Sequence, residues 1–157
     1  MHTTVREHVT LPAPQDAVFE FITSEEGFLS FRGFGPIPGL RSVQFDHGDF
    51  RTVGSVSTVT NTDGSTHRER VTVYEPSRRY AIQIDSISSP FRLLMDHAEE
   101  SWLLTAASSG TAVERMFRFV LRTPLALPLA VPIAQLLFRQ AVRRHHADLV
   151  GHVARRS

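Results

Sequence analysis

His67 and Glu69 lie two residues apart in a segment that is expected to be a β-strand. Residues 66–74 form this predicted strand, and Val71 and Val73 are its clearest apolar pair. Since alternate side chains of a strand point to the same face, His67 and Glu69 are expected to point inward with the two valines. A carboxylate in an apolar pocket has a raised pKa and can exchange protons near neutral pH. These two side chains could therefore act as acid and base, or orient the carbonyl group of a ligand.

Arg115 and Glu100 are two further charged residues at expected inward positions. Arg115 lies among the apolar residues of the predicted strand 111–121, and Glu100 shares a face with Trp102 in the predicted strand 97–106. Burying an unpaired charge is costly, so each of these side chains needs a partner of opposite charge. Arg115 could also stabilise a developing oxyanion.

The pairing of these charges leaves alternatives open. Arg115 could pair with Glu69 or with Glu100, and a shift of one residue in the strand would bring His97 and Glu99 inward instead of Glu100. The charged residues could also form a structural salt-bridge network, or lie exposed near the strand ends. The candidates for catalysis are His67, Glu69 and Arg115.

The composition excludes several kinds of chemistry. The chain has no Cys, and all 17 of its basic residues are Arg, which excludes disulfides, thiolate chemistry and Schiff bases on Lys. A net charge of +1 is too small for a nucleic-acid-binding surface. No Gly-x-Ser-x-Gly motif and no phosphate-binding loop are present, and no cofactor is expected.

The eight histidines raise the question of a metal site. His145 and His146 are adjacent, so on a helix they point about 100° apart and cannot both bind one ion well. His145 and His152 could share a helix face, but no acidic third ligand stands at a suitable spacing. We therefore expect no metal, and these histidines are predicted to lie on a solvated face of the helix.

The candidate residues depend on the elements that carry them. The apolar periodicity predicts two short helices, one over 15–23 and one capped by Ser24, and a long helix over 132–154. The Gly- and Pro-rich segment 32–40 is predicted to be an ordered loop without regular structure. Seven strands are predicted over 4–11, 40–46, 54–60, 66–74, 80–87, 97–106 and 111–121. These elements predict one α+β domain over residues 1–157, in which a curved antiparallel sheet wraps around the long helix.

Pro124, Pro128 and Pro132 recur every four residues before the long helix. Because Pro inside a helix costs about 3 kcal/mol, the segment 124–131 is predicted to be a lead-in arm and not part of a continuous helix. Its leucines could pack internally, or could form a membrane-touching or dimerising surface. The apolar stretch 125–138 is shorter than the ~20 residues of a membrane-spanning helix, so no stable membrane insertion is expected.

Several short motifs stand in and between the predicted strands. They are Gly33 to Gly39, Gly54-Ser55-Val56, Asp63-Gly64-Ser65, Glu69-Arg70-Val71, Glu75-Pro76-Ser77-Arg78-Arg79-Tyr80, Trp102, and Gly110-Thr111 with Val113. With this order of elements, they resemble the START-like (SRPBCC) superfamily, in its polyketide cyclase/dehydrase-like branch. The resemblance implies a helix-grip fold with a ligand cavity between the sheet and the C-terminal helix. It does not imply a particular ligand, because one fold serves many functions.

Three functions are compatible with this sequence. The first is binding of a small hydrophobic ligand, of lipid, isoprenoid or aromatic polyketide type, by a cytoplasmic monomer or homodimer. The second is a polyketide cyclase/dehydrase-type enzyme that uses the three candidates for catalysis. The third is a protein-interaction or stress-response module with the apolar arm as its partner surface. The residues predicted to bind the ligand are Phe34, Ile37, His67, Glu69, Val71, Ile82, Ile84, Glu100, Trp102, Arg115, Phe117, Phe119 and Leu136.

Overall fold

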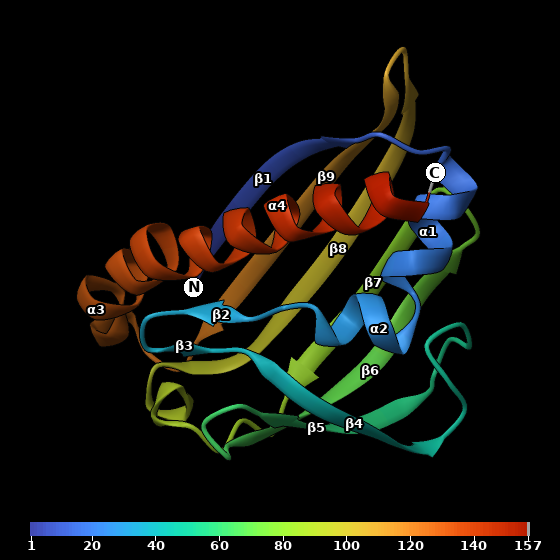
Figure 1. Ribbon diagram of the computed structural model, residues 1–157. Helices are drawn as coiled ribbons and strands as arrows, with labels where there is room; N and C mark the ends of the chain where they lie inside the picture. The colour runs from blue at the N-terminus through green and yellow to red at the C-terminus, as the bar shows by residue number, and fades with distance from the viewer. Residues whose placement is uncertain (157) are drawn as a thin grey trace.

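The computed structural model describes residues 1–156 and shows one large, curved antiparallel sheet (Figure 1). Its seven strands lie in the order β1-β9-β8-β7-β6-β5-β4. They are β1 (His2–Leu11), β4 (Leu40–His47), β5 (Val56–Asn61), β6 (Thr66–Glu75), β7 (Arg79–Asp85), β8 (Met95–Ala107) and β9 (Gly110–Leu121). The predicted seven-stranded antiparallel sheet is confirmed.

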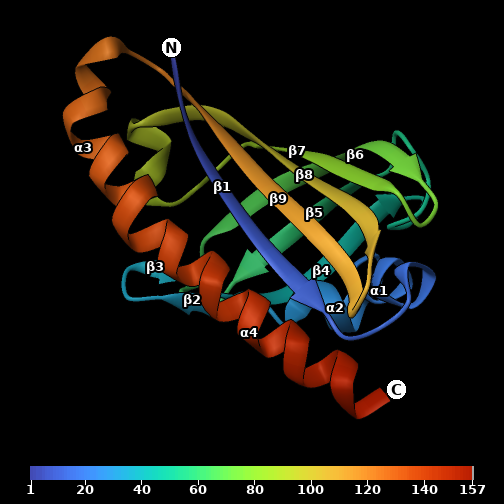
Figure 2. The ribbon, with the colours of Figure 1, turned by 90° about the horizontal axis from the view of Figure 1, so that it is seen from above.

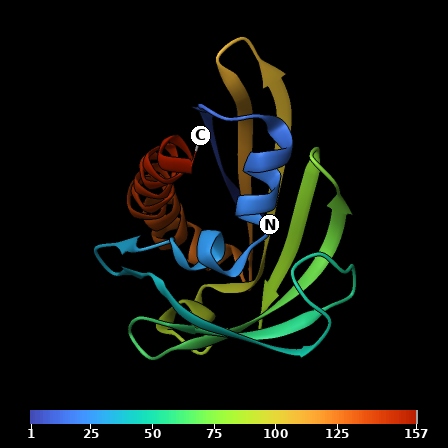
Figure 3. The same cartoon turned by 45° about the vertical axis from the view of Figure 1, so that its right-hand side comes forward.

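Helices lie against the concave face of this sheet. α1 (Gln15–Ile22) and α2 (Glu25–Leu29) follow β1, and the long α4 (Arg139–Arg156) runs along the face. Figure 3 shows the sheet curving around α4, with α1 and α2 beside it. As predicted, Ser24 caps α2, and its hydroxyl accepts a hydrogen bond of 3.1 Å from the backbone N–H of Gly27. The predicted helix-grip arrangement is confirmed.

The main core lies at the end of the sheet where α1 meets the second half of α4. Val18 of α1, Leu104 of β8 and Leu149 of α4 are at most 1% exposed and belong to one packed cluster. Along β9 every second side chain is buried, as expected for a strand with one covered face. The same alternation, continued along the strands, carries the side chains that line the cavity described below.

Two arginines hold the start of α4 against β1. Arg139 Nη1 lies 2.8 Å from Glu7 Oε1, and Arg143 Nε lies 3.0 Å from Glu7 Oε2. Both bonds are charge-assisted and the carboxylate is nearly buried, so they are stronger than an exposed ion pair. They help to position the helix across the sheet.

The inward direction of Val73 was predicted wrongly. A β-bulge between Val71 and Val73 shifts the register against β7, so that Val71 is opposite Ile82 and Tyr74 is opposite Tyr80. A bulge adds one residue to one strand and thereby reverses the faces of the residues that follow. Tyr74, and not Val73, therefore packs against the core.

The segment 32–40 is also more regular than predicted. β2 (Gly33–Phe34) and β3 (Ile37–Pro38) pair as a small antiparallel hairpin that lies beside α4 (Figure 1). Gly33 has a φ of 72°, and a Cβ added there would lie 2.2 Å from the carbonyl oxygen of Ile37. Only glycine fits this close approach. Strands of two residues are too short to show an alternation of apolar and polar residues, so the sequence pattern did not indicate this hairpin.

The predicted lead-in arm is instead the start of one helical run. A 3₁₀ turn (η2, Pro124–Ala126) continues into α3 (Leu127–Pro132), a π-helical segment (η3, Ile133–Phe138) and α4. Pro124 and Pro128 stand in the first turns of η2 and α3, where a missing N–H costs little. Pro132 is inside the run, and the π-helical segment follows it directly. The prolines therefore mark changes of helix type and not a break.

The helical run Pro124–Arg156 is long and apolar enough, by length and composition alone, to cross a membrane. Its most apolar 18-residue window has a mean hydropathy of 1.5. The apolar stretch 125–138, on which the sequence-based expectation was built, is therefore shorter than the helical run that contains it. A core helix of a globular protein can satisfy the same criterion, and this run contributes Val142, Leu149 and Val153 to the core.

Candidate functional site

A cavity of about 180 Å³ lies between the sheet, α2, the β2–β3 hairpin and the helical run. It exceeds the roughly 150 Å³ of an engineered apolar cavity that takes up benzene. Most of its lining is aromatic or aliphatic. The polar side chains that face it include Asn61, His67, Glu69, Glu100, Arg115 and His145.

Strand geometry explains why these polar side chains converge. Trp102 is directly opposite Arg115, and Glu100 is directly opposite both Ile82 and Phe117. Paired residues on adjacent strands point to the same face, so one inward residue places its partners inward as well. Glu100 therefore points inward, as expected. The alternative register, which would have turned His97 and Glu99 inward, does not occur.

One wall of the cavity consists of three phenylalanines. The ring centroid of Phe138 lies 4.7 Å from that of Phe117 and 4.9 Å from that of Phe119, with interplanar angles of 77° and 84°. Edge-to-face contacts of this kind are favoured by the ring quadrupoles. They hold the wall in place independently of any ligand.

Arg115 lies at the centre of the polar side of the cavity. Its Nε lies 2.7 Å from Glu100 Oε1, and both side chains are more than 90% buried. The guanidinium carbon is 4.1 Å from the ring centroid of Trp102 and 4.7 Å from that of Phe117. The two rings and the carboxylate together compensate the buried positive charge.

His145 extends this pair into a chain of hydrogen bonds. Arg115 Nη1 lies 2.8 Å from His145 Nδ1, and His145 Nε2 lies 2.7 Å from Ser30 Oγ. Because guanidinium can only donate, Nδ1 must accept, and the neutral ring then carries its proton on Nε2. The Ser30 hydroxyl accepts from Nε2 and donates its own hydrogen bond, of 2.6 Å, to the carbonyl oxygen of Gly27. The chain thus fixes both the tautomer and the neutral state of His145.

The electrostatic environment agrees with this assignment. Burial, followed by the positive charge of Arg115, lowers the pKa of His145 well below its usual value. Burial raises the pKa of Glu100, and Arg115 opposes that shift. Glu100 therefore takes up a proton more readily than an exposed glutamate does.

His67 and Glu69 form the second polar pair of the cavity. His67 Nε2 lies 2.9 Å from Glu69 Oε1, and both side chains are nearly buried. On the other side of the ring, the Asn61 amide nitrogen lies 3.4 Å from His67 Nδ1. Arg115 was predicted to pair with Glu69 or Glu100. The structure pairs it with Glu100 and pairs Glu69 with His67.

Ten of the residues predicted to bind a ligand line this cavity. They are Ile37, His67, Glu69, Ile82, Ile84, Glu100, Trp102, Arg115, Phe117 and Phe119. The other three lie elsewhere, so their placement was predicted wrongly. Val71 is buried in the main core, and Phe34 and Leu136 are 40% and 66% exposed. Phe34 is at the turn of the hairpin, and Leu136 is on the outer side of the π-helical segment.

The prediction of a solvated face for His145 and His146 is wrong. They are 3% and 4% exposed, and both lie within 6.3 Å of Trp102 by ring centroid. Their spacing from Val142 and Leu149 places them on the apolar stripe of α4, and this periodicity was the available signal. In residues 1–156, no three His, Asp or Glu side chains are grouped to hold a metal ion.

The sequence also matches a known protein family. The model of the family described as "Polyketide cyclase / dehydrase and lipid transport" matches residues 2–154. The chain belongs to this family. Its membership confirms the resemblance drawn from the sequence motifs. Among curated protein sequences, none matches the chain.

Solved structures with the same fold include proteins of different kinds. Ara h 8.0201 is 19% identical, with a TM-score of 0.75 and coverage of 98% of this chain and 99% of that chain. The Zhui aromatase/cyclase from Streptomyces sp. R1128 is 17% identical, with a TM-score of 0.74 and coverage of 99% and 96%. Norcoclaurine synthase from Thalictrum flavum is 11% identical, with a TM-score of 0.65 and coverage of 97% and 88%. At these identities, the similarity shows that this polyketide cyclase/dehydrase family member shares their fold.

Proposed function

We propose that this protein binds a small, electrically neutral, hydrophobic molecule that carries a carbonyl or hydroxyl group. The observation that carries the proposal is a cavity with hydrocarbon walls whose buried charges are already paired: Arg115 with Glu100, and Glu69 with His67. A ligand carboxylate would have to displace Glu100 or lie near two buried carboxylates, at a large energetic cost. A neutral oxygen can hydrogen-bond to these groups without breaking either pair.

The family and its structural neighbours support this class of ligand. The family description covers cyclases, dehydrases and lipid transport. Norcoclaurine synthase was crystallised with dopamine and hydroxybenzaldehyde, and hydroxybenzaldehyde is a small neutral aromatic molecule with a carbonyl and a hydroxyl group. The ten predicted residues that line the cavity are the proposed contacts, with His145 as an addition.

Calorimetric titration with 1-naphthol and 1-naphthoate tests the preference for a neutral ligand. The two probes share one ring system and differ in charge at neutral pH. We expect 1-naphthol to bind at least tenfold more tightly than 1-naphthoate. Burying a carboxylate beside Glu100 costs more than ~1.4 kcal/mol, and that free energy already corresponds to a tenfold difference in affinity. Equal or tighter binding of 1-naphthoate would contradict the proposed ligand class.

Ala98→Phe tests whether the cavity is the site. Ala98 is 2% exposed, lines the cavity and is opposite Ile84 and Phe119. A phenyl ring there fills the space, so 1-naphthol binding is expected to disappear. Ala106→Phe, at an exposed position near the end of the same strand, is the matched control and should bind normally. Undiminished binding by folded Ala98→Phe would place the site elsewhere.

A second candidate function, proton transfer in an enzyme of the cyclase/dehydrase type, is favoured by the ionisable groups in the cavity. Glu69 could remove a proton next to a ligand carbonyl, with Arg115 beside the resulting enolate oxygen. His67 would hold Glu69 in position. The raised pKa of Glu100 provides a carboxyl that can return a proton.

Exchange of the α-protons of 2-tetralone in D₂O, followed by NMR, tests this candidate without knowledge of the natural substrate. We expect exchange above the buffer rate, and a roughly 10²–10⁴-fold slower protein-dependent rate in Glu69→Gln, as is usual when a general base is removed. Glu99→Gln, on the outer face of β8, is the control. If bound 2-tetralone exchanges at the buffer rate, the protein is a binder and not an enzyme of this type.

A further inference from the structure

The first half of the helical run has an entirely apolar outer surface. Every exposed residue between Thr123 and Phe138 is Pro, Leu or Val. The largest are Leu125, Leu129 and Leu136, which are 88%, 57% and 66% exposed. All three are exposed, whereas Ala126, Ala130 and Ala134 of the same run are buried against the rest of the protein. We call these three residues the leucine face.

The opposite side of the same segment closes the cavity. Ala126 and Ala130 are 6% and 7% exposed and pack against Leu121 of β9. Ala130, Ile133 and Ala134 line the cavity. A single layer of helix therefore separates the cavity from the leucine face, and its small inner residues leave the bulky apolar groups outside. Figure 2 shows this segment at the end of the molecule remote from the C-terminus.

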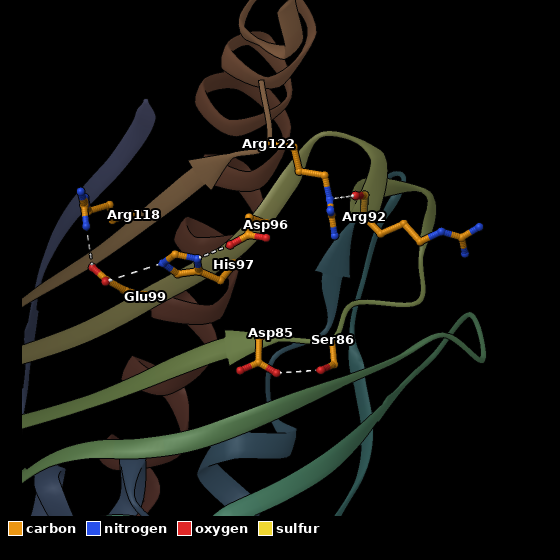
Figure 4. A network of polar contacts seen from close by, with 8 residues as sticks. All are labelled: Asp85, Ser86, Arg92, Asp96, His97, Glu99, Arg118 and Arg122. Atoms are coloured by element: carbon orange, nitrogen blue, oxygen red, sulfur yellow. Dashed lines mark hydrogen bonds and ion pairs between the residues drawn. The ribbon is translucent and has the colours of Figure 1, made fainter. Parts of the chain in front are cut away.

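Two arginines stand out beside the leucine face because they are not used in ion pairs. The sequence between Glu114 and Asp148 contains six arginines and no Asp or Glu, and four of the six bind carboxylates of other segments: Arg115, Arg118, Arg139 and Arg143. Next to this segment, Arg122 Nε donates to the backbone oxygen of Arg92 at 2.6 Å, and Arg92 Nη1 donates to the backbone oxygen of Ser88 at 3.1 Å. Within residues 1–156, both guanidinium groups thus bond to backbone oxygens, and neither lies within 4.0 Å of a carboxylate oxygen. In Figure 4 the Arg92 guanidinium points away from the neighbouring strands. The Asp96 carboxylate accepts a hydrogen bond of 2.9 Å from His97 Nδ1, and this bond, together with the nearby charge of Arg122, lowers the pKa of Asp96.

We propose that the leucine face docks onto the surface of an anionic lipid bilayer, with Arg92 and Arg122 against the lipid headgroups. Exposed hydrocarbon flanked by unpaired arginines complements a surface whose interior is apolar and whose headgroups are negative. Leu93, 69% exposed and adjacent to Arg92, extends the apolar contact. This docking goes beyond the ligand-binding function and does not depend on it.

The charges also decide between a bilayer and a second copy of the chain. A symmetric dimer uses the same patch on both subunits, so it would bring the unpaired arginines of each copy close to those of the other. Like charges brought together at an interface are destabilising. A negatively charged surface satisfies both the leucines and the arginines.

Co-sedimentation of the full chain with vesicles tests the docking. Vesicles of phosphatidylcholine and phosphatidylglycerol in a three-to-one ratio should bind the protein at least tenfold more tightly than pure phosphatidylcholine vesicles. Leu125→Gln with Leu129→Gln should weaken binding to the anionic vesicles at least tenfold, because it removes the most exposed hydrocarbon. Arg122→Gln should weaken it about fivefold, as expected for one basic residue near an anionic surface.

Matched controls and a second readout keep the test decisive. Leu103→Gln and Arg41→Gln, which change an exposed leucine and an exposed arginine on the sheet, should bind the vesicles as the parent does. All variants should retain the far-UV circular dichroism spectrum and the urea midpoint of the parent, which shows that the fold is intact whether or not 1-naphthol binds. Equal binding to both kinds of vesicle, or no loss in the leucine variant, overturns the proposal. So does a dimer in sedimentation equilibrium that the leucine variant dissociates.

Discussion

Arg115→Met is expected to lower the free energy of unfolding by about 3–5 kcal/mol, the usual cost of breaking a buried ion pair by removing one partner. The loss of stability comes from the groups that Arg115 leaves without a partner. Glu100 keeps its buried carboxylate without the guanidinium 2.7 Å away, and Nδ1 of His145 loses its donor. Urea unfolding at pH 7, with the slope held common between variants, measures the change.

Two further variants separate the buried pair from a general effect of charge. Arg118→Met removes an exposed ion pair on the same strand, between Arg118 and Glu99, and should cost less than about 1 kcal/mol. The double variant Arg115→Met with Glu100→Leu should regain most of the stability, because no unpaired charge stays buried. If the double variant is less stable than Arg115→Met alone, the carboxylate is not the cause of the loss.

Acidification is expected to destabilise the protein through its two buried histidines. Burial lowers the pKa of His146 to about 3 and that of His145 well below its usual value. The unfolded chain takes up a proton on each ring below about pH 6.5, whereas the folded chain does not. The stability that depends on keeping these two histidines neutral is therefore fully present above about pH 6.5. It is lost as the pH falls from about 6.5 toward the pKa values of the histidines in the folded protein. At pH 5 the loss through His146 is about 2 kcal/mol, and His145 adds to it in the same direction.

His146→Leu isolates one half of this effect. The raised pKa of Glu100 acts in the opposite direction, since folded Glu100 takes up its proton at a higher pH than the unfolded chain does. The difference in unfolding free energy between the parent and His146→Leu removes that contribution. It should change by about 2 kcal/mol between pH 8 and pH 5, in favour of the variant.

The parent and the variant also differ at high pH. Within residues 1–156, His146 Nε2 is buried without a hydrogen-bond partner. Replacing the ring by Leu should leave stability at pH 8 unchanged or raise it by about 1 kcal/mol. A pH-independent difference for His146→Leu would show that His146 titrates normally in the fold.

Most of the fold could be predicted from the sequence because its strands obey a simple alternation. The inward direction of Glu69, Glu100 and Arg115 followed from the faces of their apolar neighbours. Val73 could not be placed in this way, because the bulge before it depends on pairing with β7. Bulges and two-residue hairpins arise from contacts between segments, and no local pattern in one segment encodes them.

The helical run was harder to interpret for a different reason. Three prolines argued for an irregular arm, yet each stands where a change of helix type accommodates it. His145 and His146 looked like polar surface residues because hydropathy treats histidine as polar. A neutral histidine can be buried at modest cost when its ring nitrogen forms a hydrogen bond. For His145 that partner is Arg115, which is on a distant strand, so the sequence around the histidine does not indicate it.

Trp102 is the only tryptophan of the chain. It lines the cavity, is 5% exposed, and its ring lies 4.1 Å from the guanidinium carbon of Arg115. Indole emission responds to nearby charge and to water, and no second tryptophan adds an unresponsive background. The unmodified protein therefore contains its own optical reporter of an occupied cavity, so collections of natural metabolites could be screened by intrinsic fluorescence without a label.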